Sequence, residues 1–403
     1  MTRIAVLSDI HAFRPAAGRD RFLGGDPSWA RTIPDRFEEE RGPFQALGRT
    51  IEHENLKADL VFCCGDLGDK ADTEGIRHSW SWLETIRRRL DAELVIATTG
   101  NHDVDSRNTS GRDDPMHCTR VLQPPFPIDV PATRSEYWDK NVALYSSGDV
   151  DVLIVNTSAE HSTEEMAQRG RLTEETLRVI QDCVDQAKSE KRIALVHHHP
   201  YRHDAIDWRD NSELEGGPEF LRILEDDGDW LVIHGHRHYP NLVYAAGGGR
   251  SPVILAAGSF SAMLYPELQS RVRNQFHLVN LEAPGNVPGT SGIIGSVRSW
   301  EYTPSTGWAR PISQEGIPDG SGFGFRGAVD DVAERVAAYV KASPERYVVF
   351  EDVISANPEL RYLIPRDRRQ VIERLAAHGV SVSPTVNNYS VPSNEIFLKD
   401  VLT

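Results

Sequence analysis

Short apolar runs, rich in β-branched residues and bounded by turn residues, alternate along much of the chain with segments of helical periodicity. The runs predict strands at residues 3–9, 59–64, 93–97, 151–155, 193–196 and 230–233. Between them, apolar residues recur at roughly helical spacing within residues 44–56, 80–90 and 177–184. Continuous apolar strands separated by amphipathic helices are typical of a parallel sheet covered by helices. The pattern therefore predicts an α/β architecture.

The second half of the chain does not keep this alternation of strands and helices. Apolar runs at residues 253–256, 276–281 and 293–300 predict further strands, which we assign to the far sheet of a sandwich. Residues 303–326 are rich in Pro, Gly and Ser, as is typical of a linker. Beyond them, two helical patterns and two short apolar runs predict a small α/β appendage. We therefore expect a large domain at 1–302, a linker at 303–326, and a docking or oligomerisation unit at 327–403.

Polar clusters follow five of the predicted strands. A single such residue is as readily a capping aspartate or a hydrogen-bonded loop histidine as a functional group. Five clusters together favour function, because ligands of open α/β sheets bind beyond the carboxyl ends of the strands. The clusters are Asp9 with His11, Asp66 with Asp69, Asn101-His102-Asp103, His197-His198-His199, and His234-Gly235-His236-Arg237-His238.

Imidazole and carboxylate groups dominate these clusters, and sulfur is absent from them. Such donors suit Mn, Fe, Zn, Co or Ni. Two cations about 3.5–4 Å apart can clamp the attacking and leaving oxygens of a displacement at phosphorus, and a shared carboxylate is their natural bridge. Asp66 fits that role because it directly follows a strand and has Gly65 and Gly68 beside it.

The net charge of −16 argues against a general attraction to nucleic acid or to anionic lipid, although a local basic groove stays open. Residues 326–403 carry 10 Lys and Arg against 11 Asp and Glu, which leaves 34 against 49, a charge of −15, for residues 1–325. The four cysteines form no C-x-x-C pair, so neither a disulfide framework nor a thiolate zinc site is expected. No apolar run is long enough to span a membrane. Because Asp9 leaves no room for a cleavable leader, we expect a cytoplasmic protein.

The ordered motifs D-x-H, G-D-x-x-D, G-N-H-D, H-x-P and G-H-x-H resemble those of the calcineurin-like metallophosphoesterase superfamily. They span residues 9–238 and stand here as Asp9-Ile10-His11, Gly65-Asp66-Leu67-Gly68-Asp69, Gly100-Asn101-His102-Asp103, His198-His199-Pro200 and Gly235-His236-Arg237-His238. The set is most similar to the branch of class III cyclic nucleotide phosphodiesterases and glycerophosphodiesterases. It departs from that branch in the long insertion between His11 and Asp66, which includes residues 12–42, and in the appendage beyond Arg326. Residues 104–135 form a second long insertion, which we expect at the rim of the site.

The resemblance implies a four-layer α/β/β/α sandwich and two bound metal ions of the Mn, Fe or Zn type. It implies that one ion is held by Asp9, His11, Asp66 and His238, and the other by Asp66, Asn101, His198 and His236. His102 would contact the phosphate and protonate the leaving oxygen, with Asp103 or Asp69 holding its ring. A hydroxide that bridges the metals would be the nucleophile.

The register of the triple histidine is set by the same resemblance. Successive side chains of a strand point to opposite faces, so His198 points away from both His197 and His199. The family pattern of a ligand, one residue and then Pro selects His198, which leaves His197 and His199 to packing or to contacts with ligands. Arg237 lies between two predicted ligands and is either a scaffold residue or a phosphate clamp.

The function expected from the resemblance is hydrolysis of a small nucleotide or related phosphodiester. A DNA or RNA nuclease is the first alternative, which the acidity of the chain disfavours. A phosphomonoesterase is the second. A non-catalytic module that senses a ligand is the alternative of another class, and it is disfavoured because every motif position is filled. We expect a phosphate-ester substrate, no membrane partner, and a homo-oligomer or protein partner at the appendage.

Overall fold

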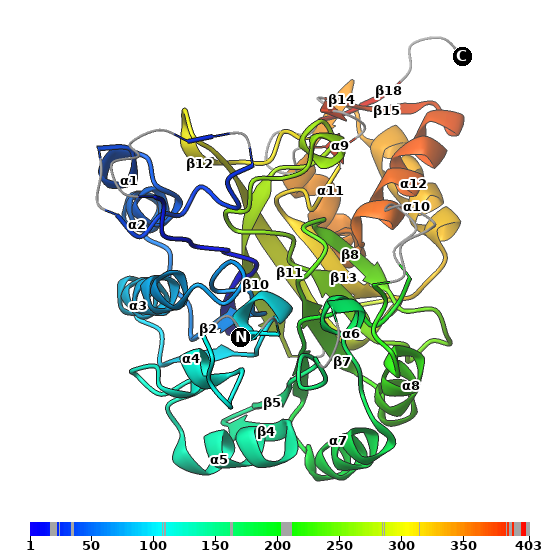
Figure 1. The fold of residues 1–403 in the computed structure, drawn as a ribbon. Coiled ribbons are helices and arrows are strands. Elements are labelled where there is room, and N and C mark those ends of the chain that lie inside the picture. The colour runs from blue at the N-terminus through cyan, green and yellow to red at the C-terminus, as the bar shows by residue number, and fades with distance from the viewer. Residues whose placement is uncertain are drawn as a thin grey trace.

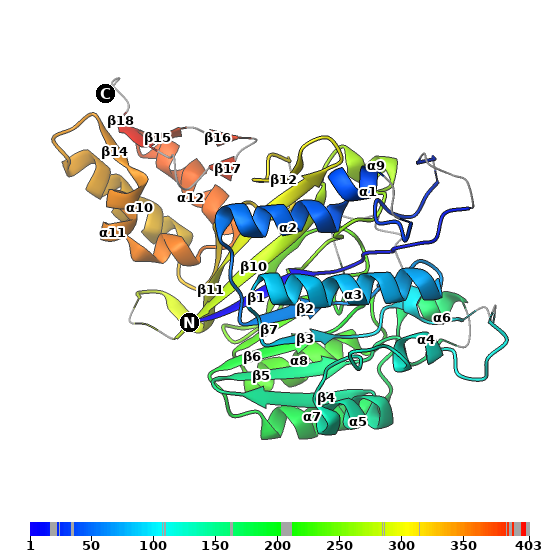
Figure 2. The same cartoon turned by 90° about the vertical axis from the view of Figure 1, so that its left-hand side faces the viewer.

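Two β-sheets pack face to face in the computed structural model, and helices cover both outer sides (Figures 1 and 2). This arrangement confirms the predicted four-layer α/β/β/α sandwich with a small C-terminal α/β appendage. The structure describes residues 1–16, 22–23, 25–33, 36–106, 108, 110–161, 164–202, 212–283, 285, 287–313, 315–383, 385–386, 389–390 and 396–399.

The first sheet has the order β12-β11-β10-β1-β2-β3, with β13 also paired to β11. Strands β1, β2 and β3 are parallel, whereas β10 and β1 are antiparallel. The strands are β1 (Thr2–Leu7), β2 (Leu60–Cys63), β3 (Leu94–Ala97), β10 (Asn274–Glu282), β11 (Thr290–Thr303), β12 (Gly307–Ala309) and β13 (Ser321–Phe325).

The second sheet has the order β4-β5-β6-β7-β9-β8. Its inner strands β5, β6, β7 and β9 are parallel, and β4 and β8 pair antiparallel at the two edges. The strands are β4 (Val142–Ser147), β5 (Val150–Val155), β6 (Lys191–Leu195), β7 (Trp230–His234), β8 (Asn241–Tyr244) and β9 (Val253–Ala256).

Long helices form the outer layers. In Figure 2, α2 and α3 lie along the first sheet, and α5, α7 and α8 lie along the second. Side-chain caps start two of them: Asp72 accepts the N–H of Gly75 at α3, and Thr173 accepts the N–H of Thr176 at α7. The long helices are α2 (Pro43–Glu54), α3 (Thr73–Arg89), α5 (Pro131–Lys140), α7 (Glu174–Gln186) and α8 (Gly217–Asp227); the short ones are α1 (Arg36–Glu40), α4 (His117–Arg120), α6 (Glu164–Arg169), α9 (Pro266–Gln269) and the 3₁₀ turn η1 (Asn101–Asp103).

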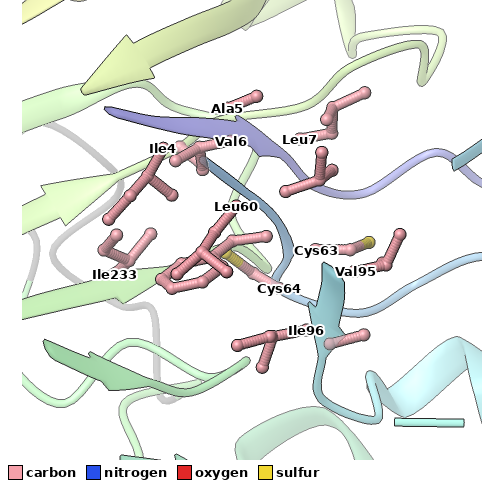
Figure 3. Close-up of a cluster of buried hydrophobic side chains, with 14 of the residues drawn as sticks. Ile4, Ala5, Val6, Leu7, Leu60, Cys63, Cys64, Val95, Ile96 and Ile233 are labelled. Carbon is pink, nitrogen blue, oxygen red and sulfur yellow. The ribbon is translucent and has the colours of Figure 1, made fainter. Parts of the chain in front are cut away.

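Strict alternation along β6 and β7 divides the core into two layers. Ile193 and Leu195 point between the sheets and join the cluster that holds Ile4, Leu60 and Ile233, part of which Figure 3 shows. Ala194 and Val232 in these strands, and Val196 directly after β6, point outward and pack under α7 and α8. Because both faces are apolar, these strands have no polar side in the sequence.

Two predictions about the second half of the chain are wrong. Residues 303–326 are not a linker, because β12 and β13 lie there and both pair with β11. Small residues suit β13, where a side chain on Gly322 would lie 1.9 Å from the backbone oxygen of Arg361. The runs assigned to the far sheet are also divided: β9 joins β7, but β10 and β11 extend the sheet of β1.

The C-terminal module, residues 329–399, has its own core and a three-stranded sheet of order β14-β18-β15. Tyr362 donates its hydroxyl hydrogen to Glu282 at the end of β10, and Arg326 lies 3.6 Å above the Tyr244 ring. Since Leu281 pairs with Thr2, the module adjoins the end of the sheet where β1 begins. Its elements are α10 (Val329–Ala342), β14 (Tyr347–Val349), α11 (Phe350–Ala356), η2 (Pro358–Tyr362), α12 (Pro365–Ala377), β15 (Val380–Ser383), β16 (Thr385–Val386), β17 (Tyr389–Ser390) and β18 (Ile396–Lys399).

Among the described residues, no helix combines the length and apolar character needed to cross a bilayer.

The packing between the sheets predicts a large effect for Ile193→Ala. Ile193 is 0% exposed, so the truncation should lower the free energy of unfolding by about 2–5 kcal/mol. The same substitution at Ile312, which is 64% exposed, is the matched control and should change it by less than about 0.5 kcal/mol. Urea unfolding in the presence of a chelator measures both. Equal effects at the two positions would contradict the assigned core.

Candidate metal centre

Five strands deliver their polar clusters to one edge of the sandwich. Strands β1, β2 and β3 of the first sheet and β6 and β7 of the second all end there. The loops that follow bind one another through the backbone: Asp9 N–H donates to the Gly65 carbonyl at 3.1 Å, and Gly235 N–H donates to the His197 carbonyl at 3.1 Å. The convergence predicted from the strand ends is therefore present.

The first group of possible ligands combines residues that follow β1, β2 and β7. The Nε2 atoms of His11 and His238 are 3.0 Å apart, and His238 Nε2 lies 3.3 Å from Asp9 Oδ1. Asp66 Oδ2 lies 3.5 Å from His11 Nε2. Metal bonds of about 2.0–2.2 Å place neighbouring ligand atoms at about these separations. Asp9, His11, Asp66 and His238 therefore have the spacing of a coordination shell.

The second group combines β2, β3, β6 and β7. His197 Nε2 lies 3.4 Å from Asp66 Oδ2 and 3.0 Å from Asn101 Oδ1, and His236 Nδ1 lies 3.1 Å from the same Asn101 oxygen. Asp66 Oδ2 thus stands between His11 of one group and His197 of the other. This is the geometry expected of a carboxylate shared by two ions.

The triple histidine is turned differently from the prediction. His197 continues the inward series of Ile193 and Leu195, and its Nδ1 lies 2.8 Å from the Cys64 carbonyl oxygen. His198 points to the outer side, where its Nδ1 lies 2.8 Å from the Thr157 hydroxyl. Its ring is 4.5 Å from that of His236, and a ring nitrogen of His198 lies within 4.8 Å of ligand atoms of His197 and His236. The contacts to Asp66 and Asn101 come from His197. The geometry favours His197 in the place that we predicted for His198.

The backbone at the ligands is strained. Asp9, His11, Asp66, His236 and His238 have φ values of 51°, 51°, 55°, 79° and 54°. Left-handed backbone of this kind costs of order 1–3 kcal/mol for a residue other than glycine, and it gathers at functional sites. A close approach adds to the constraint, because a side chain on Gly235 would lie 2.2 Å from Asp9 Oδ2.

Buried charges and ring nitrogens make this a site for cations. Burial lowers the pKa of His197 to about 4, and burial with repulsion from other rings lowers those of His11 and His236, which keeps the rings neutral. Burial raises the pKa of Asp66. His236 Nε2 is buried without a hydrogen-bond partner among the described residues. Neutral imidazoles and clustered carboxylates are the form that binds divalent metals, so the residues present fit a metal pair.

Comparison with protein families identifies the family to which this arrangement belongs. The family model described as Calcineurin-like phosphoesterase matches residues 2–240, which is more than half of the chain. The chain belongs to the calcineurin-like phosphoesterase family. The resemblance seen in the five motifs is thereby confirmed at the level of the family, and the cyclic nucleotide branch stays a prediction.

Several solved structures are similar to this phosphoesterase. The purple acid phosphatase from yellow lupin (Lupinus luteus) seeds is 13% identical with a TM-score of 0.45, covering 76% of this chain and 52% of that one. The 5′-nucleotidase precursor from Thermus thermophilus is 12% identical with a TM-score of 0.37, covering 76% and 55%. This chain thus spans about half the length of either protein. A comparison with curated protein sequences finds no match.

A second family model, described as wHTH-Calcineurin_assc, matches residues 321–377. The match begins at Ser321 in β13 and ends with α12, so it covers the helices of the C-terminal module. We predicted the appendage to begin at residue 327, six residues later in the chain. The matched segment thus includes a strand that belongs to the first sheet.

Beside the ligands of this phosphoesterase lies His102, whose ring contacts Asp69. His102 Nδ1 is 3.0 Å from Asp69 Oδ1. Burial lowers the pKa of His102, but the charge of Asp66 and the bond to Asp69 outweigh it and raise the pKa to about 9. Of the two carboxylates predicted to hold this ring, Asp69 is the one in contact. Asp103 instead accepts backbone N–H groups of the Asp66 loop.

His199 and Arg237, the remaining predicted residues, lie beside His236 of the second group. The ring of buried His199 stacks at 5.8 Å on that of His236, and half-buried Arg237 adds positive charge that lowers the pKa of His236. Sequence reasoning missed Ser8, which donates to Asp9 Oδ2, and Thr157, which contacts His198. Neither has a motif of its own. Ser8 could have been noticed only as the neighbour of a predicted ligand.

The two neighbouring histidines provide a direct test of the second group. His197→Ala should remove a ligand and weaken binding of the second metal by more than the 10–100-fold typical of losing a hydrogen-bond partner of a ligand. His198→Ala should have the smaller effect. Metal titration of the purified chain, with content checked by elemental analysis, measures both variants. A larger loss in His198→Ala would restore the original prediction.

Proposed function

We propose that this protein is a metal-dependent phosphodiesterase acting on a small diester. The observation that carries the proposal is the position of Asp66 Oδ2 between His11 and His197, with His102 and Asp69 beside it. Family membership supports ester hydrolysis at phosphorus, and the geometry supports a pair of ions that share one carboxylate.

We propose Asp9, His11, Asp66 and His238 as ligands of the first ion, and Asp66, Asn101, His197 and His236 as ligands of the second. Two divalent cations held there would neutralise phosphate charge and acidify a water molecule. Carboxylate, amide and imidazole donors are compatible with Mn, Fe or Zn. The protein contributes the rest of the chemistry through His102.

His102 is proposed to act as the general acid. A protonated imidazole can donate its Nε2 hydrogen to the leaving oxygen while Asp69 holds Nδ1. The carboxylate fixes the tautomer and stabilises the positive ring. His102 keeps about a third of its side chain exposed, which allows it to meet a substrate from solvent.

The choice of a small diester rests on charge and on the motifs. A diester phosphate carries one negative charge, whereas a monoester carries close to two and a nucleic acid carries one at every phosphate. The chain has a net charge of −16, which repels polyanions more than a singly charged ester. The G-N-H-D and H-H-P motifs, which resemble the diesterase branch, point the same way. A cytoplasmic location stays part of this proposal.

A substrate panel tests the function. With Mn(II) added, the protein should hydrolyse bis-p-nitrophenyl phosphate faster than p-nitrophenyl phosphate, and should leave single-stranded DNA intact. Cyclic mononucleotides belong in the same panel. Preferential release from the monoester would assign the protein as a phosphomonoesterase, and cleavage of the polymer would assign it as a nuclease. No turnover of any substrate by metal-loaded protein would favour a sensing module.

His102→Ala tests the proposed acid. Turnover of a diester with a poor leaving group should fall by about 10²–10⁴-fold, because the proposed proton donor to the departing oxygen would be lost. Metal content should stay at the wild-type value, since His102 is not among the proposed ligands. The activated nitrophenyl ester is the control, and its hydrolysis should fall less. A variant that loses metal, or slows both esters equally, contradicts the role.

A further inference from the structure

Asp103 is a buried carboxylate at the centre that the proposed function leaves without a ligand role. Its side chain is 0% exposed. Oδ1 accepts the N–H groups of Leu67 at 2.8 Å and Gly68 at 3.2 Å, and Oδ2 accepts those of Asp66 at 2.9 Å and Gly100 at 2.9 Å. Consecutive backbone N–H groups of this kind form a concave site for an anion.

The contact between the two loops is reciprocal. Asp103 accepts the N–H of Asp66, and Asp66 Oδ1 in turn accepts the N–H of His102 at 2.7 Å. With Oδ1 engaged in this way, Oδ2 is the oxygen left to face His11 and His197. The orientation of the shared carboxylate therefore depends on the bond that anchors its own backbone.

Glycine allows the two loops to come this close. A side chain on Gly100 would place its first carbon 2.2 Å from the Asp66 nitrogen, far inside contact distance. Gly100 is also one of the four donors to Asp103 and directly precedes Asn101. The loop after β2 and the loop after β3 are thus joined through one carboxylate, and each carries a proposed ligand of the second ion.

We propose that Asp103 is a positioning residue that aims Asp66 and Asn101 and thereby sets the affinity of the second metal site. This inference rests on the ligand set of the proposed function. It replaces the expectation that Asp103 holds the His102 ring, a contact that Asp69 makes. A carboxylate is required because both oxygens accept two N–H groups. An asparagine would turn its NH₂ group toward two donors and leave them without an acceptor.

Metal binding by D103N tests the inference in the full chain. The chelator-treated wild type should take up two Mn(II) ions in a calorimetric titration. D103N should bind the second ion about 10–100-fold more weakly, as is typical when a partner of a metal ligand is lost. The first ion should be affected less, because Asp9, His11 and His238 do not contact Asp103 in the described bonds.

D151N is the matched control for loss of a buried acceptor. Asp151 is also buried and accepts the N–H groups of Lys188 and Ser189, both at 2.7 Å, but it lies in β5 of the second sheet, whereas Asp103 follows β3 of the first. The melting temperature of D151N should be lower than that of wild type by the same amount with and without Mn(II). In D103N, the increase in melting temperature caused by Mn(II) should shrink. An unchanged increase in D103N would overturn the inference.

D103E provides a second measurement if metal-free D103N does not fold. It keeps two acceptor oxygens and the charge but moves them by one methylene, so its second-site affinity should lie between those of wild type and D103N in a metal-loaded preparation. If D103E and D103N both bind the second Mn(II) ion as tightly as wild type, the role of Asp103 is contradicted and the proposed function is not affected. A wild-type chain that binds no pair of ions would contradict the proposed function itself.

Discussion

The position of a single oxygen, Asp66 Oδ2, depends on the contact between the two sheets. It lies within 3.5 Å of His11 from the first sheet and 3.4 Å of His197 from the second. The sheets are held in register by the apolar layer between them, in which Ile193 and Leu195 meet Ile4 and Leu60. A pair of ions at this place would therefore bind both halves of the sandwich, and sliding of one sheet would separate their ligands.

Much of the fold and of the site could be predicted because the relevant signal is local. An apolar run followed by Asp9 or Asp66 marks the carboxyl end of a buried strand, and such ends converge in parallel sheets. The directions in which His197 and His198 point could not be predicted from their neighbours in the sequence. All four residues of 193–196 are apolar. Alternation alone therefore does not show which side chains of β6 point between the two sheets.

The assignment of strands to the two sheets could not be predicted from the sequence either. Both β9 and β10 were predicted as strands from short apolar runs, and only their partners, β7 and β1, show that they belong to different sheets. Residues 303–326 resembled a linker because glycine and serine are common there, yet β13 needs Gly322 where its backbone passes Arg361. Pairing between distant segments and close backbone contacts depend on the tertiary structure, and composition does not encode them.

The C-terminal module adjoins the end of the first sheet where β1 begins, and the ligand loops lie beyond the other end. Tyr362 reaches Glu282 beside the start of β1, whereas Asp9 and His11 follow its last residue, Leu7. The whole length of β1, Thr2–Leu7, therefore separates the module from the ligand loops. Because the two lie at opposite ends of this strand, a substitution on the face where Tyr362 meets Glu282 changes the module without touching a ligand loop.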